Sequence, residues 1–443
     1  MEEFNVSAYV LVSWLLFLTT VATLFFSILK HRYLLVKPSI ATIFFFTVTI
    51  QFAATVSAAR IESYLPEPLH FLLLAHGFPL IGLFGSLLFQ RDTASFLFKR
   101  IDNYEFKQDK SVIKMLWFIT ALISVAYLAE VPLRSTGLYS IITDPISSVQ
   151  AREDSLKLLD NAFVRYGYLF LMSVVAPLLA IMIYYQASYQ KKFRNTISAV
   201  IQIIFIFILV SFSGARSAAV NILLAIIIAH FLKNKFKFNL YKVLISIFAI
   251  MLIPAILSIM REGAEMSSVL IIQYIVDSIF GRIFYVPMEV GLWHVHYAQT
   301  NGLIYAAGIP KLANLLGIEA ISLANVIYLT YTPYVLESGS ANTSFVFSYY
   351  AMFGIAILPI LLLLLWSLDL CLPLLKKMKP QVLLPTIACL ILISKAFTVS
   401  DFTTTLITHG YILLFILAIF LDWFGKSKFI IIQHKSCEDG KVV

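Results

Sequence analysis

The chain has 443 residues, of which 60% are hydrophobic and only 13% charged, and its mean hydropathy is +0.89. Soluble globular domains are about half apolar and about a quarter charged, so this composition excludes a soluble domain and indicates a polytopic membrane protein. The formal net charge is +9, but most basic residues lie in short loops between apolar runs, where they orient helices. Nucleic-acid binding is therefore not expected.

Apolar runs of about 17 to 25 residues, the length that crosses a hydrocarbon core of roughly 30 Å, recur along the chain. We predict an all-α fold, a polytopic membrane bundle of about 11 transmembrane helices that forms a single integral membrane domain over 1–443. The predicted spans are 6–29, 39–59, 69–89, 112–132, 164–186, 196–213, 217–232, 242–260, 344–370, 382–400 and 405–424.

The connecting segments, taken alternately, differ sharply in charge. One set holds 23 of the 33 basic residues, 19 of them lysine, whereas the opposite set holds nine, of which seven are arginine. Because basic loops stay on the cytoplasmic side, we predict an N-terminus outside and a C-terminus in the cytoplasm. Arginine offers a planar fork for phosphate or carboxylate, so the outer arginines favour an anionic ligand; the alternative is that they pair with outer acidic residues.

Two of the outward segments are long, a first loop at 133–163 and a larger one at 261–343. Within the larger loop, 266–285 and 288–299 alternate apolar and polar residues at helical spacing, and neither is uniformly apolar. We interpret them as interfacial or re-entrant helices, and the whole loop as the lid over an active site.

Arg216 lies in Ser-Gly-Ala-Arg-Ser (213–217), a tight connection between two apolar runs. A glycine turn places backbone N–H groups beside a guanidinium, and both can meet a phosphate. The alternative is a plain hairpin with a snorkelling arginine.

Seven residues separate Arg282 from Glu289, and seven more separate Glu289 from His296, so on a continuous helix the three share one face. They supply a cation for a diphosphate and a carboxylate or imidazole for a proton, although an Arg282–Glu289 ion pair could merely hold the loop. His294 and His296 point to different sides of a helix, and no Asp-x-Asp motif stands in an outer loop. We therefore expect no metal and no other cofactor.

These features together resemble the O-antigen and oligosaccharide repeat-unit polymerases of the Wzy type. The resemblance rests on the outer Ser-Gly-Ala-Arg-Ser hairpin, on a long outer loop with Arg282 and Pro287, and on the helix Asn-Thr-Ser-Phe-Val-Phe-Ser-Tyr-Tyr-Ala-Met-Phe-Gly (342–354). It covers roughly residues 110 to 370.

The resemblance implies a metal-independent glycosyltransferase of the bacterial inner membrane that transfers an undecaprenyl-diphosphate-linked glycan onto another lipid-linked repeat unit at the periplasmic face. It also implies a chain-length regulator and a flippase as partners. The catalytic base is expected to be Glu289, His294 or His296. The implied diphosphate ligands are Arg152, Arg216, Arg261 and Arg282, and the aromatic residues that stack on sugars are Tyr285, Trp293 and Tyr349.

Two other activities compete with this interpretation. An O-antigen ligase acts on the same lipid-linked glycan but transfers it to a different acceptor, and sequence alone barely separates the two enzymes. A lipid-linked-oligosaccharide flippase would show repeated halves and a charged central cavity, and the chain contains no visible repeat.

Overall fold

The computed structural model describes residues 7–102, 110–143, 155, 158–190, 193–214, 216–234, 281, 284–332 and 340–425. These residues form helices joined by turns, and no β-strand occurs among them, which confirms the predicted all-α class.

Nine helical segments in the described part of the chain are long and apolar enough to cross a membrane, which confirms a polytopic helical bundle. A tenth apolar helix, α14 (Arg216–Lys233), is shorter. The predicted span 242–260 lies outside the described residues. The nine segments are α1 (Ala8–Lys30); Pro38–Val56, with α2 (Pro38–Phe46) and α3 (Phe52–Val56); Pro68–Leu88, with α5 (Pro68–Leu72) and α6 (Phe78–Leu88); α8 (Lys110–Glu130); Ala162–Gln190, with α11 (Ala162–Phe170) and α12 (Ala176–Gln190); α13 (Phe193–Val210); Ile355–Leu375, with α21 (Leu358–Ser367) and α22 (Leu372–Leu375); Pro380–Thr398, with α23 (Pro380–Ser394); and Phe402–Phe424, with α24 (Phe402–Ile407) and α25 (Tyr411–Phe424).

The remaining described helices are short or polar and connect or cover these spans. They include α4 (Ala58–Tyr64), α7 (Arg91–Asp102), α9 (Gly137–Thr143), α17 (Val286–Asn301), α18 (Pro310–Leu315), α19 (Leu323–Tyr331) and α20 (Phe345–Phe353).

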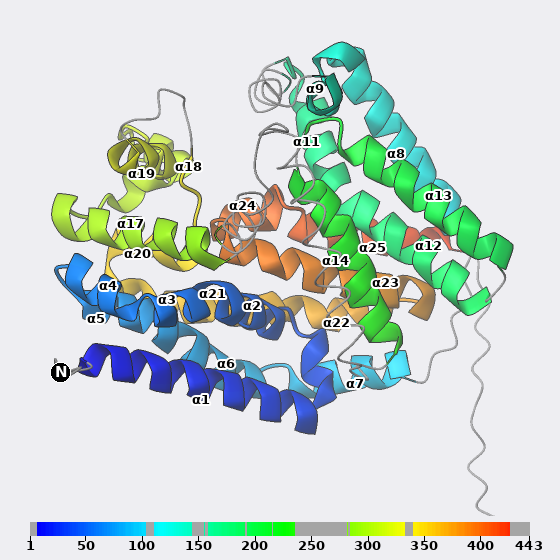
Figure 1. Ribbon diagram of the computed structural model, residues 1–443. Coiled ribbons are helices and arrows are strands. Elements are labelled where there is room, and N and C mark those ends of the chain that lie inside the picture. The colour runs from blue at the N-terminus through cyan, green and yellow to red at the C-terminus, as the bar shows by residue number, and fades with distance from the viewer. Residues whose placement is uncertain are drawn as a thin grey trace, which may run out of the picture.

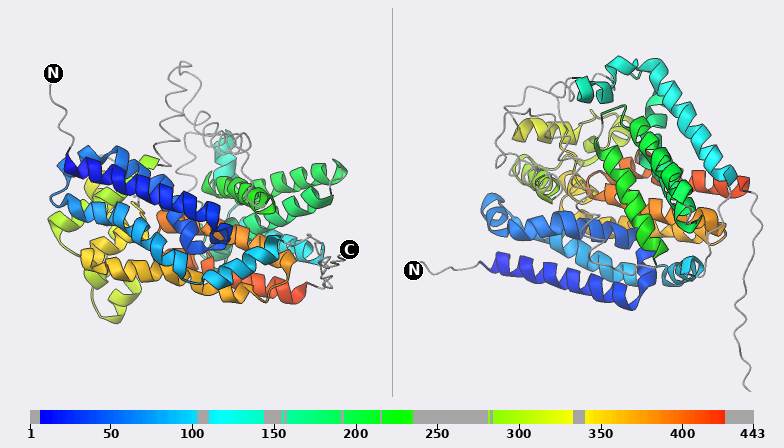
Figure 2. Two further views of the ribbon diagram at one scale, coloured as in Figure 1. Left: turned by 90° about the horizontal axis from the view of Figure 1, so that it is seen from below. Right: turned by 45° about the vertical axis from the view of Figure 1, so that its right-hand side comes forward.

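The spans form two groups around a shared centre (Figure 1). One group contains α1 to α7 with α17 to α22, the other contains α8 to α14, and α23 to α25 lie between them; Figure 2 shows the same division from two other sides. The central helix α23 packs on α2 of the first group and on α12 and α14 of the second. In the most apolar window of each span, 89% of the Pro380–Thr398 residues are buried but only 17% of those of α1. α1 therefore lies at the periphery and presents most of its surface to lipid.

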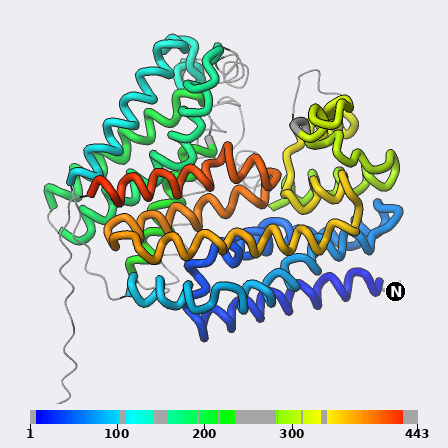
Figure 3. Tube along the Cα trace, turned by 180° about the vertical axis from the view of Figure 1, so that it is seen from behind, coloured from blue at the N-terminus to red at the C-terminus, as the bar shows by residue number. Residues whose placement is uncertain are grey.

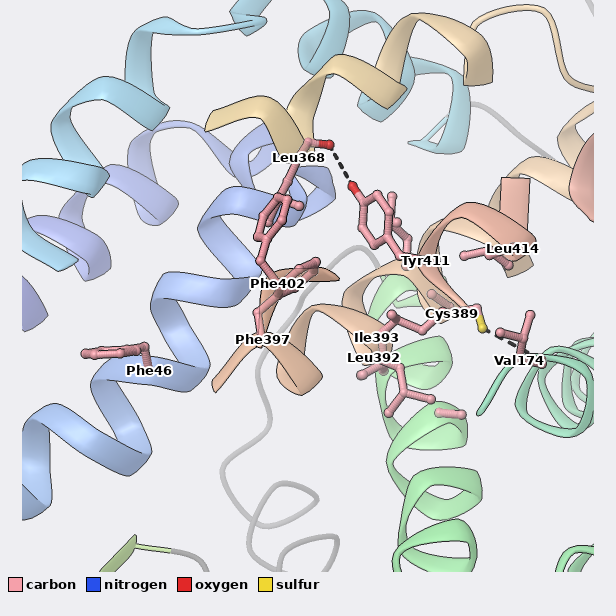
Figure 4. Close-up of a cluster of buried hydrophobic side chains, with 14 of the residues drawn as sticks. Phe46, Val174, Leu368, Cys389, Leu392, Ile393, Phe397, Phe402, Tyr411 and Leu414 are labelled. Atoms are coloured by element: carbon pink, nitrogen blue, oxygen red, sulfur yellow. Dashed lines mark hydrogen bonds between the residues drawn. The ribbon is translucent and has the colours of Figure 1, made fainter. Parts of the chain in front are cut away.

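The centre of the bundle is a cluster of aromatic and apolar side chains that includes residues of α2, α23, α24 and α25 (Figure 4). The ring of Phe397 lies 5.3 Å from that of Phe402 and 5.7 Å from that of Tyr411. Tyr411 donates its hydroxyl to the Leu368 carbonyl at 2.6 Å, so a buried tyrosine joins the last span to the end of α21 (Leu358–Ser367). The buried hydroxyl is satisfied, as polar groups in hydrocarbon must be.

Helix α20 enters the bundle only halfway. Its first residue, Phe345, packs against Phe78, which stands at the middle of the 21-residue span Pro68–Leu88. Tyr350, near the end of α20, packs against His70, near the start of the same span. α20 is therefore antiparallel to that span, and its N-terminus lies at half depth.

The chain reverses after α20, at Gly354, whose φ of +71° is one that residues with a side chain rarely adopt. Trp366 in the following span donates to the Gly82 carbonyl at 3.0 Å. Three residues later Asp369 pairs with Lys37, which also binds the Phe89 carbonyl at the far end of the span that α20 entered. α21 therefore runs parallel to α6, and Figure 3 shows the turn from behind.

This reversal corrects one sequence prediction. The run 344–370 was expected to be a single span, but its first third is the re-entrant helix α20, and the true span is Ile355–Leu375. Hydropathy is continuous across the turn, since residues on both sides of Gly354 are apolar, and an apolar run alone does not reveal a change of direction.

The lysine-containing connections meet at one end of the bundle, which we call the lysine-rich end and define by Lys37, Arg100, Lys376 and Lys379. Arg100 donates to the carbonyls of Lys376 and, at 2.8 Å, Met378. These contacts close the end of the first helix group.

A buried ion pair lies at the same end. Lys37 Nζ and the Asp369 carboxylate are 3.1 Å apart, and neither side chain has any exposed surface. Asp369 also accepts hydrogen bonds from the backbone N–H of Ser39 at 3.1 Å and from its hydroxyl at 2.7 Å. Both charges are thus paired and hydrogen-bonded, which is the condition for keeping them inside a membrane protein.

Candidate functional site

The predicted re-entrant segment contains α17, which lies at the end of the first helix group opposite the lysine-rich end. Pro287 stands in the first turn of this helix, where its missing N–H costs little. Gly302, with φ +88°, ends it. α17 has 16 residues and is not among the nine candidate spans in the described part of the chain.

Four side chains at helical spacing lie along one side of α17: Tyr285, Glu289, Trp293 and His296. We call this the α17 face. It contains four of the residues that the sequence singled out, and it meets α4 and α19.

Glu289 forms a bidentate ion pair with Arg60 of α4. The two guanidinium nitrogens donate to its two carboxylate oxygens at 2.9 and 2.6 Å. The Glu289 side chain is 13% exposed and that of Arg60 is 45% exposed, so solvent and ligands reach the pair mainly from the arginine side. The Arg60 guanidinium also lies 5.6 Å from the centre of the Tyr285 ring, within range of a cation–π contact.

Aromatic rings continue this surface toward the end of α17. The ring of His296 stacks on Tyr64 of α4 with 4.6 Å between centres, and its Nδ1 lies 2.5 Å from the Tyr331 hydroxyl of α19. The ring of Trp293 lies parallel to that of Tyr331, with 5.6 Å between centres. The α17 face therefore combines one carboxylate and one guanidinium with a row of aromatic surfaces.

Burial sets the protonation of two side chains here. It lowers the pKa of His296 below 6.5, so the neutral imidazole dominates at pH 7, and its Nδ1 shares a hydrogen bond with the Tyr331 hydroxyl. Burial also raises the pKa of Tyr64, with a further contribution from the Glu289 carboxylate that Arg60 partly offsets. Both side chains are therefore uncharged at neutral pH.

His294 lies on the opposite, buried side of α17. Its Nδ1 lies 2.8 Å from the Val290 carbonyl one turn earlier, and burial lowers the pKa of His294 to about 4. This side of the helix packs against α20, and a Cβ at Gly291 would lie 2.6 Å from the Phe347 ring. The structure thus separates His294 from His296, as the spacing predicted.

A hydrogen-bonded cluster holds the far end of α17 in place. The Gln299 side chain accepts from the backbone N–H of Glu67 at 3.2 Å and donates to its carbonyl at 3.0 Å. Gln299 also donates to the Tyr350 hydroxyl at 3.4 Å, and His70 Nδ1 lies 2.8 Å from the same hydroxyl. α17 is thereby fixed to α5 and to the re-entrant helix α20.

Tyr349, the third aromatic residue expected to bind sugar, lies apart from the α17 face. It hydrogen-bonds to Thr403 at the start of α24 and lies close enough to Asp401 for an electrostatic interaction. Asp401 caps that helix by accepting from the Thr404 N–H at 2.9 Å. Tyr349 thus belongs to the polar groups beside the half-depth N-terminus of α20.

The structure gives a partial account of the expected diphosphate ligands. Arg216 is the first residue of α14, directly after the turn at Gly214, whose φ is +72°. The turn packs backbone to backbone on α9: a Cβ at Gly137 would lie 2.6 Å from the Ser213 carbonyl, and Leu138 donates to the Phe212 carbonyl at 3.2 Å. Arg152, Arg261 and Arg282 lie outside the described residues, as does the side chain of Arg216.

Within the described ranges, no group of three or more histidine, cysteine, aspartate or glutamate side chains is arranged to hold a metal ion. The polar groups that gather at the α17 face are a carboxylate, a guanidinium, an imidazole and hydroxyls. They can bind an anion, hydrogen-bond to sugar hydroxyls and accept a proton.

Sequence reasoning missed Arg60, Tyr64 and Tyr331. Arg60 and Tyr64 are four residues apart just beyond the second span, so they share one side of a short helix. An arginine and a tyrosine spaced four residues apart at the end of a span could have marked this position as a candidate binding residue pair. Their partner on α17, however, is 229 residues away along the chain.

Comparison with known proteins identifies no relative, because no family model, no curated protein and no solved structure matches this chain.

Proposed function

We propose that this protein is a bacterial inner-membrane glycosyltransferase that polymerises undecaprenyl-diphosphate-linked oligosaccharide repeat units into a surface polysaccharide. The observation that carries the proposal is the α17 face, where the bidentate Arg60–Glu289 pair adjoins the rings of Tyr285, Trp293 and Tyr331. Aromatic rings stack on the apolar faces of sugars, and carboxylates accept hydrogen bonds from their hydroxyls. The resemblance of 213–217 and 342–354 to repeat-unit polymerases points the same way.

The lysine-rich end faces the cytoplasm in this proposal, because basic connections stay on that side. The N-terminus and the α17 face are then periplasmic, and the C-terminus is cytoplasmic. This orientation brings the Arg60–Glu289 pair to the level at which the diphosphate of a lipid-linked glycan meets water, with the polyprenyl chain in the bilayer beside it.

The proposed chemistry uses an exchange of ion-pair partners. The incoming diphosphate draws the exposed Arg60 guanidinium from Glu289. The freed carboxylate takes the proton of the acceptor hydroxyl, the acceptor oxygen bonds to the anomeric carbon, and the bond from that carbon to the diphosphate breaks. The diphosphate leaves with the bonding electron pair as undecaprenyl diphosphate, its growing charge met by guanidinium groups.

The other residues of the site bind and orient the glycan. Neutral His296 and its Tyr331 partner offer hydrogen bonds to sugar hydroxyls, while Tyr285 and Trp293 provide stacking surfaces. Tyr349 binds sugar nearer the half-depth end of α20. His294, buried against α20, supports the helix and takes no part in proton transfer.

Arg152, Arg216, Arg261 and Arg282 complete the proposal as further diphosphate ligands. A flippase delivers the lipid-linked repeat units, and a chain-length regulator acts on the product.

Deletion of the gene in its native host, followed by electrophoresis of the surface polysaccharide, tests the proposal. We expect surface glycan with a single repeat unit, restored to long chains by a plasmid copy. Complete loss of repeat units would contradict polymerisation and indicate a ligase or a flippase.

A further inference from the structure

A separate pocket lies at the lysine-rich end, where α1, the turn η1 (Arg32–Val36) and the amphipathic helix α7 meet. Its volume is about 550 Å³, within the roughly 300 to 1,000 Å³ typical of ligand sites. It is far from the α17 face, because α1 begins at one end of the bundle and ends at the other (Figure 1). Its polar lining consists chiefly of Lys30, His31, Arg32, Tyr33, Lys99 and Asp102.

Three cations line this pocket, and none of them forms an ion pair with another described residue. Lys30, Arg32 and Lys99 are exposed, and among the described residues none of them lies within 4.0 Å of a carboxylate oxygen. The pocket includes a single acidic side chain, Asp102, so positive charge dominates it.

Three other basic residues at the same end are used internally. Lys37 pairs with Asp369, Arg100 binds two backbone carbonyls, and Lys379 donates to the Asp422 carbonyl at 2.6 Å. The contrast distinguishes the pocket from a general basic surface. Its three charges line one concavity, where they can meet an anion together.

The pocket lies at the boundary between hydrocarbon and water. Lys30 is the last residue of the 23-residue apolar helix α1, and Leu29 lines the pocket while remaining 54% exposed. The adjoining α1 surface is also apolar and open, with Phe25 58% and Phe26 67% exposed. A ligand here meets cations at its head and an apolar surface along its length.

We propose that this pocket binds the phosphate of an anionic lipid headgroup in the leaflet at the lysine-rich end, with Lys30, Arg32 and Lys99 as its ligands. The lipid chains lie along the exposed surface of α1. Basic pockets between membrane helices favour such headgroups, and each cation near the surface contributes to the attraction. The site is independent of the chemistry proposed for the α17 face.

The test uses the full-length protein in a neutral detergent, with native mass spectrometry to count and rank bound lipids. Phosphatidylglycerol is titrated beside phosphatidylcholine, glycerol 3-phosphate and inorganic phosphate. We expect one phosphatidylglycerol to bind more tightly than any of the other three. The combined substitutions Lys30→Gln, Arg32→Gln and Lys99→Gln should weaken that binding roughly 100-fold.

A charge-matched control removes three exposed cations at the first turns of α8 and α13: Lys110→Gln, Lys114→Gln and Arg194→Gln. It should retain the tight lipid. A second variant, Lys30→Arg with Lys99→Arg, keeps the charge and should also bind, which covers the case in which the neutral variant fails to fold.

Three outcomes would overturn the proposal: equal loss of binding in the neutral variant and its control, equal affinity for phosphatidylcholine, or glycerol 3-phosphate binding as tightly as the lipid. The last would identify a site for a soluble phosphate.

Discussion

Arg60 and Glu289 form an ion pair between two segments that are 229 residues apart. The exposure and the bidentate geometry of this pair suit an arginine that exchanges the carboxylate for a phosphate. An ion pair with one well-exposed member contributes little to folding because water screens it. Its fork geometry, by contrast, is as well suited to a phosphate as to a carboxylate. At the scale of single residues, the α17 face therefore combines a guanidinium open to ligands with a carboxylate that is mostly covered.

The first prediction concerns this pair. Glu289→Gln should reduce polymer formation by about 100-fold or more, the usual contribution of a general base. Arg60→Ala should also abolish long chains, and Arg60→Lys should restore little, since an ammonium lacks the fork. Polysaccharide gels with quantified membrane protein measure the effect. The exposed Glu319→Gln serves as the control, and long chains in both Glu289→Gln and Arg60→Ala would remove the proposed mechanism.

The second prediction concerns His294. Its pKa of about 4 in the folded protein is below the unfolded value of 6.5, so the unfolded chain binds more protons between these values. Stability is therefore complete above pH 6.5 and falls as the pH drops toward 4, by about 3 kcal/mol from this residue. His294→Leu should flatten the decline when thermal midpoints in detergent are compared between pH 7 and pH 5. Parallel curves for the two proteins would contradict the assignment.

Among the elements, α17 and α20 form a pair of partial helices packed face to face. Their close approach depends on Gly291, because the Phe347 ring occupies the space a side chain would need. Two π-helical turns, η2 (Thr47–Gln51) and η3 (Leu73–Gly77), meet beside this pair, and η2 contacts α17. Such turns often adjust the geometry of functional sites. The packing beneath the α17 face thus depends on the missing side chain of Gly291 and on the two π-helical turns beside it.

The third prediction tests this packing. Gly291→Ala should destabilise the protein by roughly 1 to 3 kcal/mol, because the added methyl group forces α17 from α20. Adding Phe347→Leu should recover part of the loss, as the smaller side chain makes room. Gly167→Ala is the control, since a Cβ there meets only Ile123 at 4.0 Å. Additive effects of the two substitutions in thermal unfolding would show that the predicted clash is absent.

Individual elements differ in how well the sequence predicts them. The span over 382–400 was recognised despite Lys395, because most of its other residues are apolar. The run 344–370 was wrongly predicted to be one span, because the chain reverses its direction there without a change in hydropathy. On α17, spacing alone correctly placed Glu289 and His296 on one face and His294 on another. The partners Arg60 and Tyr331 depend on tertiary contacts, which no local pattern specifies.

For the whole molecule, the lysine-rich end unites segments from distant parts of the chain. Ser39 and Asp369 are 330 residues apart, and Lys37 links them to the end of the span Pro68–Leu88. Buried charges are costly alone but tolerated when paired and hydrogen-bonded. This pair therefore fixes which ends of the early and late spans lie together.

The fourth prediction follows from that pairing. Lys37→Met or Asp369→Leu alone should each destabilise the protein by roughly 3 to 5 kcal/mol, because each leaves an uncompensated buried charge. The double variant should be more stable than either single variant. Thermal unfolding in detergent measures the three proteins. A double variant as unstable as the sum of the two losses would rule out charge compensation.

The fifth prediction concerns orientation. After replacement of the native cysteines, Ser63→Cys near the α17 face should react with a membrane-impermeant thiol reagent in intact cells. Lys377→Cys at the lysine-rich end should react only after the membrane is opened. Both positions are exposed in the structure, so access to the reagent depends on the side of the membrane. The reverse pattern would place the α17 face in the cytoplasm and contradict the proposed function.

The reversal at Gly354 also has a consequence for biogenesis. A nine-residue helix is too short to cross the bilayer and cannot stay at half depth without protein around it. The rings that receive α20, those of Phe46, Phe71 and Phe78, belong to spans made roughly 270 to 300 residues earlier. Because the ribosome makes the N-terminal part first, the spans that receive α20 already exist when α20 is synthesised. In a truncated chain that lacks these early spans, α20 should have no protein surface to pack against inside the membrane.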